Sequence, residues 1–242
     1  FTLNTPKSIF QRNLIDKCDI VLSINSFSFD ISLQEIHLPL LNGKCIVIIN
    51  DIYSPNISDK YSFNSKYQYG LIITPTKIKY YMQNKSFCET LKYFKIIMCG
   101  AEIFPISLVN EIKKYTSSII YNGYGPTETT CGSLYSNVAA DNITIGKPIA
   151  NTQIYILDKN RKPLPIGVAG ELCISGDGVG KGYLNRPELT AEKFIPNPFI
   201  EGKTMYCTGD LARWLEDGEI EYLGRIDTQV KIRGLRIELG EI

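Results

Sequence analysis

The sequence predicts an α/β protein in which a parallel α/β part is followed by an antiparallel, β-rich part. Short aliphatic runs alternate with helical patterns up to about residue 142, and strand–helix–strand order implies parallel pairing with right-handed crossovers. Beyond that point, period-two alternation and turn dipeptides such as Asp217-Gly218 dominate. The 242 residues, 44% of them hydrophobic, suffice for one or two domains with a sizeable core.

The first part contains four apolar runs of strand length and one clear helical pattern. The strands are expected at residues 41–50, 70–74, 93–98 and 118–121. Pro105 is expected in the first turn of a helix, where its missing N–H costs nothing. Leu108, Ile112 and Tyr115 follow at helical spacing, which predicts one apolar helix face.

The second part has the patterns of antiparallel strands and hairpins. Strands are expected at residues 152–157 and 170–175, where apolar and polar residues alternate. Residues 212–215 and 219–223 flank an Asp-Gly turn, which is a strong hairpin signal. A second hairpin is expected at residues 229–238, around Gly234.

The composition excludes several classes of function. Lys and Arg total 26 and Asp and Glu total 25, so the formal net charge is +1 and no nucleic-acid partner is indicated. Aliphatic runs such as residues 45–49 are too short to cross a membrane and suit buried strands. His37 is the only histidine, and none of the seven cysteines forms a Cys-x-x-Cys pair, so no zinc-site spacing is present.

The cysteines and the chain ends give two further expectations. An odd number of cysteines with apolar neighbours predicts reduced, buried thiols in a cytoplasmic protein. The chain has no signal-peptide pattern. It opens on Phe1 rather than Met and stops at Ile242 inside a patterned stretch, so we expect a piece of a longer polypeptide.

Residues 122–130, Asn-Gly-Tyr-Gly-Pro-Thr-Glu-Thr-Thr, carry the strongest chemical signal. They follow an expected parallel strand, and open parallel sheets bind ligands at the carboxyl ends of their strands. The glycines permit close backbone approach to a ligand, the threonines offer hydroxyls to phosphate, and Glu128 offers a hard oxygen to Mg²⁺. Tyr124 offers a flat face for a base. The structural alternative is an ordinary Gly-Pro turn beside a threonine cluster.

Several motifs, in the correct order, make the chain resemble the adenylation domains of nonribosomal peptide synthetases, which are members of the adenylate-forming superfamily. Residues 123–128 contain the Tyr-Gly-Pro-Thr-Glu core. Residues 186–194, Arg-Pro-Glu-Leu-Thr-Ala-Glu-Lys-Phe, are typical of peptide synthetases. Residues 206–211, Tyr-Cys-Thr-Gly-Asp-Leu, resemble the nucleotide-ribose motif, and residues 224–241 resemble the hinge motif.

The resemblance implies part of the large N-terminal domain of this superfamily, the ANL type. Its parallel α/β subdomain would occupy residues 1–142 and its distorted antiparallel β-barrel residues 143–226. Residues 227–242 would form the hinge, at Asp227, and the start of a C-terminal lid. Lys231, Arg233 and Arg236 would belong to a loop facing the tunnel of an acceptor phosphopantetheine.

The resemblance also implies the cofactors, ATP and Mg²⁺, and a nucleotide site. Tyr124 would stack on adenine, Asn122 would bond its edge, and Asp210 would accept the ribose hydroxyls. Thr127 would touch phosphate, Glu128 would hold Mg²⁺, and Arg225 would meet ribose or phosphate. The remaining implied nucleotide contacts are Gly100, Ala101, Glu102, Gly123, Gly125 and Tyr222. The catalytic set is Thr127, Glu128 and Arg225. Considered alone, Arg225 would favour a surface ion pair.

The same resemblance implies a substrate pocket and partners. Asp30, in Phe29-Asp-Ile-Ser32, would pair with the α-ammonium of an amino acid. Standing alone, Asp30 would favour a helix N-cap or an Asx turn. The rest of the expected lining is Ile31, Gln34, Ile72, Ile97, Cys99, Gly123, Cys131 and Gly132. Mostly small or apolar, it predicts a hydrophobic amino acid, passed on to the phosphopantetheine thiol of a carrier domain in a synthetase that makes a secondary metabolite.

Two parts of the family's machinery are expected outside these residues. The phosphate-binding loop would precede Phe1, and the lid's catalytic lysine would follow Ile242, so the isolated chain is expected to be inactive. The alternatives are an acyl- or aryl-CoA ligase of the same superfamily and a non-catalytic nucleotide-binding scaffold. A dinucleotide oxidoreductase is excluded because no Gly-x-Gly-x-x-Gly opens an early helix.

Overall fold

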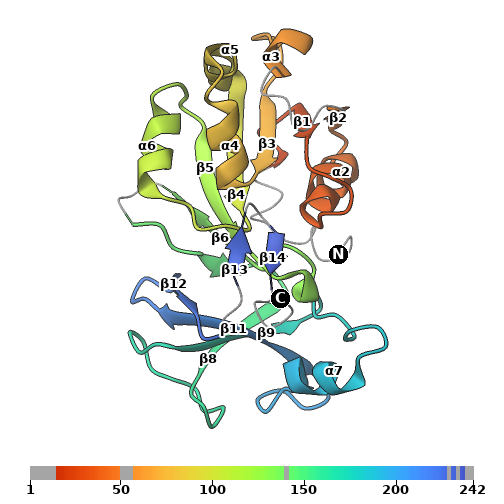
Figure 1. Cartoon of the computed structure of the whole chain (residues 1–242), viewed down its shortest axis with the longest axis vertical. Coiled ribbons are helices and arrows are strands. Elements are labelled where there is room, and N and C mark those ends of the chain that lie inside the picture. Colours follow the sequence, from red (N-terminus) through yellow and green to blue (C-terminus); the bar gives the residue numbers. More distant parts are fainter. Residues whose placement is uncertain (1–14, 50–56, 139–141, 228–229, 233–234, 238–242) are drawn as a thin grey trace. The chain divides into compact units, whose positions relative to one another are not determined.

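The structure, a computed structural model, describes residues 15–49, 57–138, 142–227, 230–232 and 235–237. The chain forms two compact units, each described here by itself (Figure 1). The α/β unit contains the described residues up to Gly123 together with the return segment Asn137–Ile143. The β unit contains Tyr124–Ser136 and the described residues from Thr144 onward.

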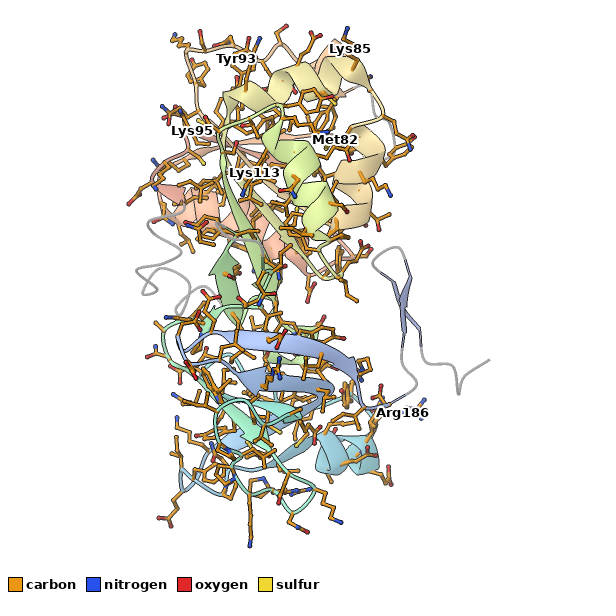
Figure 2. The ribbon with its side chains drawn as sticks, turned by 90° about the vertical axis from the view of Figure 1, so that its left-hand side faces the viewer. Met82, Lys85, Tyr93, Lys95, Lys113 and Arg186 are labelled. Atoms are coloured by element: carbon orange, nitrogen blue, oxygen red, sulfur yellow. The ribbon has the colours of Figure 1, made fainter. Side chains whose placement is uncertain are left out.

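The α/β unit is built on parallel strands that follow the order β2-β1-β3-β4-β5. The strands are β1 (Ile20–Ser23), β2 (Cys45–Ile48), β3 (Tyr69–Ile73), β4 (Phe94–Gly100) and β5 (Ile119–Tyr124). The helices are α2 (Ile31–Leu41), α3 (Ile57–Lys60), α4 (Pro75–Tyr81), α5 (Lys85–Thr90) and α6 (Ile106–Lys113). Tyr93 and Lys95, labelled in Figure 2, mark the amino-terminal end of β4, whereas the expected site residues come at carboxyl ends.

Helices cover both faces of these strands because the strand side chains alternate between the faces. Leu71, Ile73 and Ile97 pack with buried residues of α4, α5 and α6 in the main core. Val21 lies on the other face, in a smaller cluster with Leu38 of α2. Figure 1 shows α2 on the opposite side of the strands from α4 and α6. The strand face that α2 covers is therefore the one closest to Asp30, which lies at the start of α2.

The β unit is antiparallel. Its five-stranded sheet has the order β10-β11-β9-β8, with β12 also paired to β11. The strands are β8 (Thr152–Leu157), β9 (Gly170–Gly176), β10 (Phe194–Pro196), β11 (Thr204–Trp214) and β12 (Ile220–Arg225). The other elements are β6 (Leu134–Asn137) paired with β7 (Lys147–Pro148), the helix α7 (Pro187–Lys193), and the hairpin of β13 (Val230–Ile232) and β14 (Leu235–Ile237).

The predicted α/β class and the change to antiparallel structure are confirmed, with two corrections. Residues 41–50 are not one strand: α2 runs to Leu41, and Gly43, with φ of 66°, supplies the left-handed residue that ends a helix. Strand β5 extends to Tyr124 rather than ending at residue 121, so Asn122 to Tyr124 close the strand instead of following it. The domain boundaries at residues 142 and 226 remain a prediction.

The predicted burial is confirmed in most places. Leu108 and Ile112 are buried on α6, whereas Tyr115 is exposed, because the helix ends at Lys113. Six of the seven cysteines are buried free thiols, but Cys45 is exposed on β2. The part of the chain that the structure describes contains no helix with the length and hydropathy of a membrane span.

Candidate functional site

The segment from Tyr124 to Cys131 forms a tight turn in the β unit. Thr127–Thr129 make one turn of 3₁₀ helix, and Thr130 and Cys131 then adopt left-handed conformations with φ of 67° and 71°. A Cβ on Gly125 would lie 2.0 Å from the Cys131 carbonyl oxygen. Only glycine therefore fits at position 125. Thr130 and Cys131 are not glycines but are held at positive φ, and such strained backbone positions cluster at functional sites.

Asp210 is the buried centre of a cluster beside this turn. The residue is 5% exposed, and its carboxylate accepts hydrogen bonds from the Tyr124 hydroxyl and, at 3.0 Å, from Arg225 Nη1. Asp210 and Arg225 are register partners across β11 and β12, so strand pairing brings the charges together. The cluster therefore consists of a carboxylate with one cationic and one phenolic donor.

Arg225 is fixed by more than Asp210. Its Nη1 also donates to the Thr208 carbonyl oxygen at 2.9 Å, and its Nε donates to Asp227 Oδ1 at 2.8 Å. Its Nη2 donates to the second Asp227 oxygen, which makes that pair bidentate. Gly209, at φ of 72°, leaves room for this arrangement, because a Cβ there would approach both Arg225 Nη2 and Asp227 Oδ2 to 2.8 Å.

The local charges shift the pKa values of three residues in this cluster. Burial and the nearby Asp210 raise the pKa of Tyr222 to about 12 and hold the pKa of Tyr124 well above its ordinary value. Burial by itself lowers the pKa of Arg225, but Asp227 and Asp210 outweigh burial and the pKa rises. Both phenols are thus neutral donors and the guanidinium is permanently charged. The Tyr124 and Tyr222 rings lie 6.3 Å apart, centroid to centroid.

A loop after β9 supports Glu128, and sequence reasoning missed its key residue, Tyr183. The Tyr183 hydroxyl donates to Glu128 Oε1 at 2.6 Å, and Gly180 N donates to the Glu128 carbonyl oxygen at 2.8 Å. The Thr130 hydroxyl donates to the Gly178 carbonyl oxygen at 2.6 Å. The available signal in the sequence was a tyrosine directly after a glycine-rich run that ends at Gly182. Arg186 lies farther along, exposed before α7 (Figure 2).

The residues of this turn fit a hard cation. Glu128 supplies a carboxylate and Thr127 an exposed hydroxyl, and Mg²⁺ prefers such oxygen atoms together with phosphate and water. One hydrogen bond from Tyr183 leaves a carboxylate with further acceptor positions. The donor set is therefore compatible with the Mg²⁺ that the sequence motif implies.

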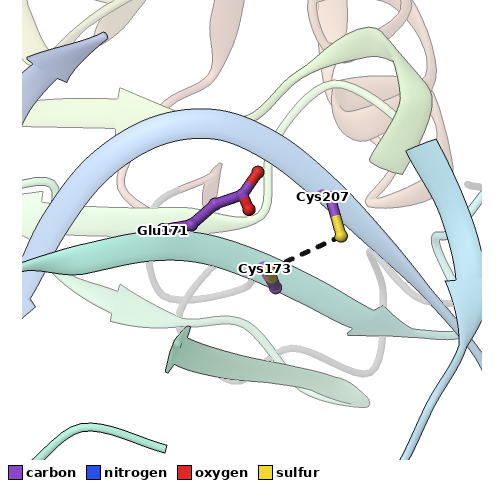
Figure 3. A group of neighbouring side chains, drawn as sticks. All are labelled: Glu171, Cys173 and Cys207. Atoms are coloured by element: carbon purple, nitrogen blue, oxygen red, sulfur yellow. Dashed lines mark hydrogen bonds between the residues drawn. The ribbon is translucent and has the colours of Figure 1, made fainter. Parts of the chain in front are cut away.

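A second group of potential ligands has different chemistry. Strand pairing brings Glu171, Cys173 and Cys207 together with their ligand atoms within 4.8 Å of one another, although their sequence spacing gave no such signal (Figure 3). Cys173 Sγ donates to Cys207 Sγ at 3.8 Å, and this bond, together with burial, raises the Cys173 pKa. Glu171 accepts from Gly209 N at 3.0 Å. These contacts describe a buried thiol pair packed beside a hydrogen-bonded carboxylate.

The α/β unit carries the other expected residues. Asp30 occupies the N-cap position of α2, but its side chain makes no capping hydrogen bond, and the buried Ile31 and Gln34 follow on the helix. Gly100 and Gly123 are register partners at the carboxyl ends of β4 and β5, where a Cβ on Gly100 would come within 2.9 Å of the Gly123 carbonyl oxygen. Further expected residues here are Ile72, Ile97, Cys99, Ala101, Glu102 and Asn122. Cys131 and Gly132 belong to the β unit.

Strand alternation separates the expected pocket residues of β3 and β4. Ile97 and Cys99 are fully buried in the main core with α4, α5 and α6. Ile72 pairs with Met98, so these two side chains lie on the opposite face, the one covered by α2. The register therefore favours Met98 over Ile97 and Cys99 as a neighbour of Ile72.

Comparisons with known proteins agree with this geometry. Residues 3–184 match the model of the AMP-binding enzyme family. The chain is 43% identical over 248 residues to tyrocidine synthase 3 of Brevibacillus parabrevis, covering 99% of this chain and 4% of that protein. It is 41% identical over 242 residues to gramicidin S synthase 1 of Brevibacillus brevis, covering 98% of this chain and 21% of that protein.

Solved structures give the same family. IdnL1 matches with a TM-score of 0.88 and 25% identity over 99% of this chain and 51% of its own. PA1221, a nonribosomal peptide synthetase protein containing adenylation and PCP domains, matches with a TM-score of 0.83 and 26% identity over 99% of this chain and 49% of its own. The chain thus spans about half of these structures or less. It belongs to the AMP-binding enzyme family and is homologous over nearly its whole length to nonribosomal peptide synthetase adenylation domains.

Proposed function

We propose that the full-length protein uses this site to activate an amino acid as its adenylate at the expense of ATP and to pass the aminoacyl group to a phosphopantetheine thiol. The observation that carries the proposal is the buried Asp210, held by Arg225 and Tyr124 in the β unit. A carboxylate can accept two hydroxyl donors, as a ribose presents them. An AMPPNP-bound form of the homologous synthetase FmoA3 supports the use of ATP.

Each residue has a role in this reaction. Asp210 binds the ribose hydroxyls, and the Tyr124 ring packs on adenine while its hydroxyl stays on Asp210. Asn122 and the backbone of residues 100–102 bind the base edge, Tyr222 packs nearby, and Gly125 lets the backbone approach the nucleotide. Thr127 and Arg225 orient phosphate oxygens for in-line attack by the substrate carboxylate. Asp227 serves as the hinge for a lid.

Glu128 is the proposed Mg²⁺ ligand, and Tyr183 holds its carboxylate in place. Mg²⁺, when bound, offsets the negative charge of the phosphate groups. The product adenylate is then handed to the thiol of a carrier domain. PA1221 supports that partner, because this homologous protein contains adenylation and PCP domains in one chain.

Asp30 is the proposed partner of the substrate's α-ammonium group. The side-chain pocket is proposed to include Ile31, Gln34, Ile72, Ile97, Cys99, Gly123, Cys131 and Gly132. This lining favours a hydrophobic amino acid because it contains no charged side chain.

Amino-acid-dependent exchange of pyrophosphate into ATP by the full-length protein tests the function. We expect exchange with one or a few hydrophobic amino acids and loss of exchange in Asp210→Ala. Exchange with fatty or aryl acids alone would indicate a CoA ligase. Absence of exchange with any acid, in a folded protein, would indicate a nucleotide-binding scaffold.

A further inference from the structure

Glu35 is a fully buried carboxylate in the α/β unit, outside every motif that carried the family resemblance. Its exposed fraction is 0%, and four donors point at its two oxygens. Ile24 N and Asn25 Nδ2 donate to Oε1 at 3.1 and 2.7 Å. Asn25 N and the Ser23 hydroxyl donate to Oε2 at 3.1 and 3.3 Å. Every donor comes from the three residues at and after the end of β1.

The hydrogen bonds continue beyond Glu35 to the neighbouring strand and helix. The Asn25 side-chain amide that contacts Glu35 also donates to the Ile72 carbonyl oxygen of β3 at 3.1 Å. Lys77 Nζ donates to the Ile24 carbonyl oxygen from α4. One carboxylate of α2 is therefore connected to the carboxyl ends of β1 and β3, on the strand face that carries Ile72.

We propose that Glu35 is a positioning residue for amino-acid recognition: it fixes the first turns of α2, and with them Asp30, against the strand face of Ile72 and Met98. The proposal rests on the proposed function of Asp30. Glu35 follows Asp30 by five residues, about one and a half helical turns, so a displacement of one end of this segment moves the other.

The shifted pKa of Glu35 indicates that burying its carboxylate costs free energy. Burial raises the pKa of Glu35 to about 7, although hydrogen bonds from Ile24 and Asn25 and the charge of Lys77 oppose that shift. Burial lowers the pKa of Lys77 to about 8, although Glu35 opposes that shift. A buried carboxylate with only neutral hydrogen-bond donors contributes less stability than an apolar residue of similar volume, so a positional role gives a reason for its presence.

The test compares Michaelis constants in the full-length protein, using the amino acid that supports exchange in the wild type. Glu35→Gln keeps the size of the side chain but directs an amide donor at four donors. We expect the KM for the amino acid to rise about tenfold while the KM for ATP stays unchanged. A small displacement of Asp30 weakens its contact with the substrate's ammonium group and leaves the nucleotide contacts in place. Glu111→Gln, on the exposed face of α6, is the matched control and leaves both constants unchanged.

A second variant keeps the test valid if Glu35→Gln does not fold. Asn25→Ala leaves the carboxylate but removes the amide that connects it to Ile72, and we expect a smaller rise in the same KM, about threefold. An unchanged amino-acid KM, or an equal rise in both constants, would overturn the proposal and leave Glu35 a general structural residue. A wild type without exchange for any amino acid would instead overturn the proposed function, and this proposal with it.

Discussion

Two buried carboxylates, one in each unit, are stabilised in different ways. Asp210 of the β unit faces a guanidinium, at 3.0 Å from Arg225, and a tyrosine hydroxyl. Glu35 of the α/β unit faces two backbone amides, a side-chain amide and a hydroxyl, with no cation within bonding distance among the described residues. The first arrangement compensates the charge directly, whereas the second leaves the carboxyl group with a pKa raised to about 7, so that it is partly protonated near neutral pH.

The two arrangements suit two different roles of acidic residues in a binding site. A group that must stay ionised to accept ribose hydroxyls gains from a permanent cation at its side. A group that holds backbone in place gains from several neutral donors with fixed geometry. The two sites should therefore respond differently to loss of one partner and to pH.

The largest effect is expected for Arg225→Met in the isolated chain. This change leaves Asp210 buried without its cation and should lower the free energy of unfolding by roughly 3 kcal/mol. The single tryptophan, Trp214, packs against the core of the β unit, so its fluorescence during urea unfolding reports on this unit.

Arg213→Met is the matched control on the same hairpin. Arg213 pairs with Glu221 at 2.6 Å but has 41% of its side chain exposed, and such pairs contribute at most about 1 kcal/mol. Equal losses in the two variants would contradict the view that burial makes the Asp210 pair special.

The next effect is a dependence of stability on pH that arises from Glu35. Its folded pKa, about 7, lies above the ordinary value of 4.5, so folding favours the protonated form. The stability of the α/β unit should be greatest near about pH 5 and fall by on the order of 3 kcal/mol as pH rises to about pH 8. Urea unfolding followed by circular dichroism measures this slope, which Glu35→Gln should flatten.

The titration of Lys77 does not obscure the pH dependence of stability that is expected from Glu35. The folded pKa of Lys77, about 8, lies below the ordinary value of 10.5, so its cost to folding is complete only below the folded value and disappears as pH rises to 10.5. Its contribution therefore stays nearly constant below about pH 8. Wild-type stability that rises from about pH 5 to about pH 8, with the same slope in Glu35→Gln, would contradict the assignment.

A smaller effect is expected for Tyr183→Phe, which removes the hydroxyl that contacts Glu128. The loss of one hydrogen bond should cost about 1 kcal/mol of stability, and in the full-length protein it should weaken binding of Mn²⁺, a probe for the Mg²⁺ site, as followed by electron paramagnetic resonance. Tyr155→Phe is the control, because its hydroxyl accepts only a long contact, 3.4 Å, from Asn197. Identical Mn²⁺ binding in both variants would remove Tyr183 from the site.

The smallest effect concerns the cysteines and requires no mutation. Cys45 lies exposed on β2, whereas the other six thiols are buried. A thiol reagent such as a disulfide dye should therefore modify one cysteine rapidly in the folded chain, and peptide mapping should identify it as Cys45. Rapid modification of Cys173 or Cys207 would contradict the packed thiol pair.

Local patterns predicted much of the fold. Period-two alternation and the Asp217-Gly218 turn led to the correct hairpin, and the aliphatic runs led to the buried strands. The end of α2 was missed because Leu41 continues an apolar run into the next strand, and only the positive φ of Gly43 separates the two elements. The helix N-cap alternative for Asp30 was correct for its position at the start of α2, but the side chain does not make the capping hydrogen bond.

The site was predictable where motifs carry it and not where packing does. Asp210, Arg225 and Tyr124 were identified by resemblance, and the structure brings them together. Tyr183 contacts a residue 55 positions away along the chain, and Glu35 contacts residues 10 to 12 positions away. No spacing rule predicts contacts of this kind. The sequence did not show that Ile72 lies on the opposite strand face from Ile97 and Cys99, because only the pairing register of β3 with β4 gives that.

The most direct test of the central claim is a crystal structure of the full-length adenylation region with a non-hydrolysable aminoacyl-adenylate analogue. We expect ribose hydroxyls within hydrogen-bond distance of Asp210 and the analogue's ammonium group within hydrogen-bond distance of Asp30. A ribose bound away from Asp210, or an ammonium group paired with a different carboxylate, would contradict that claim.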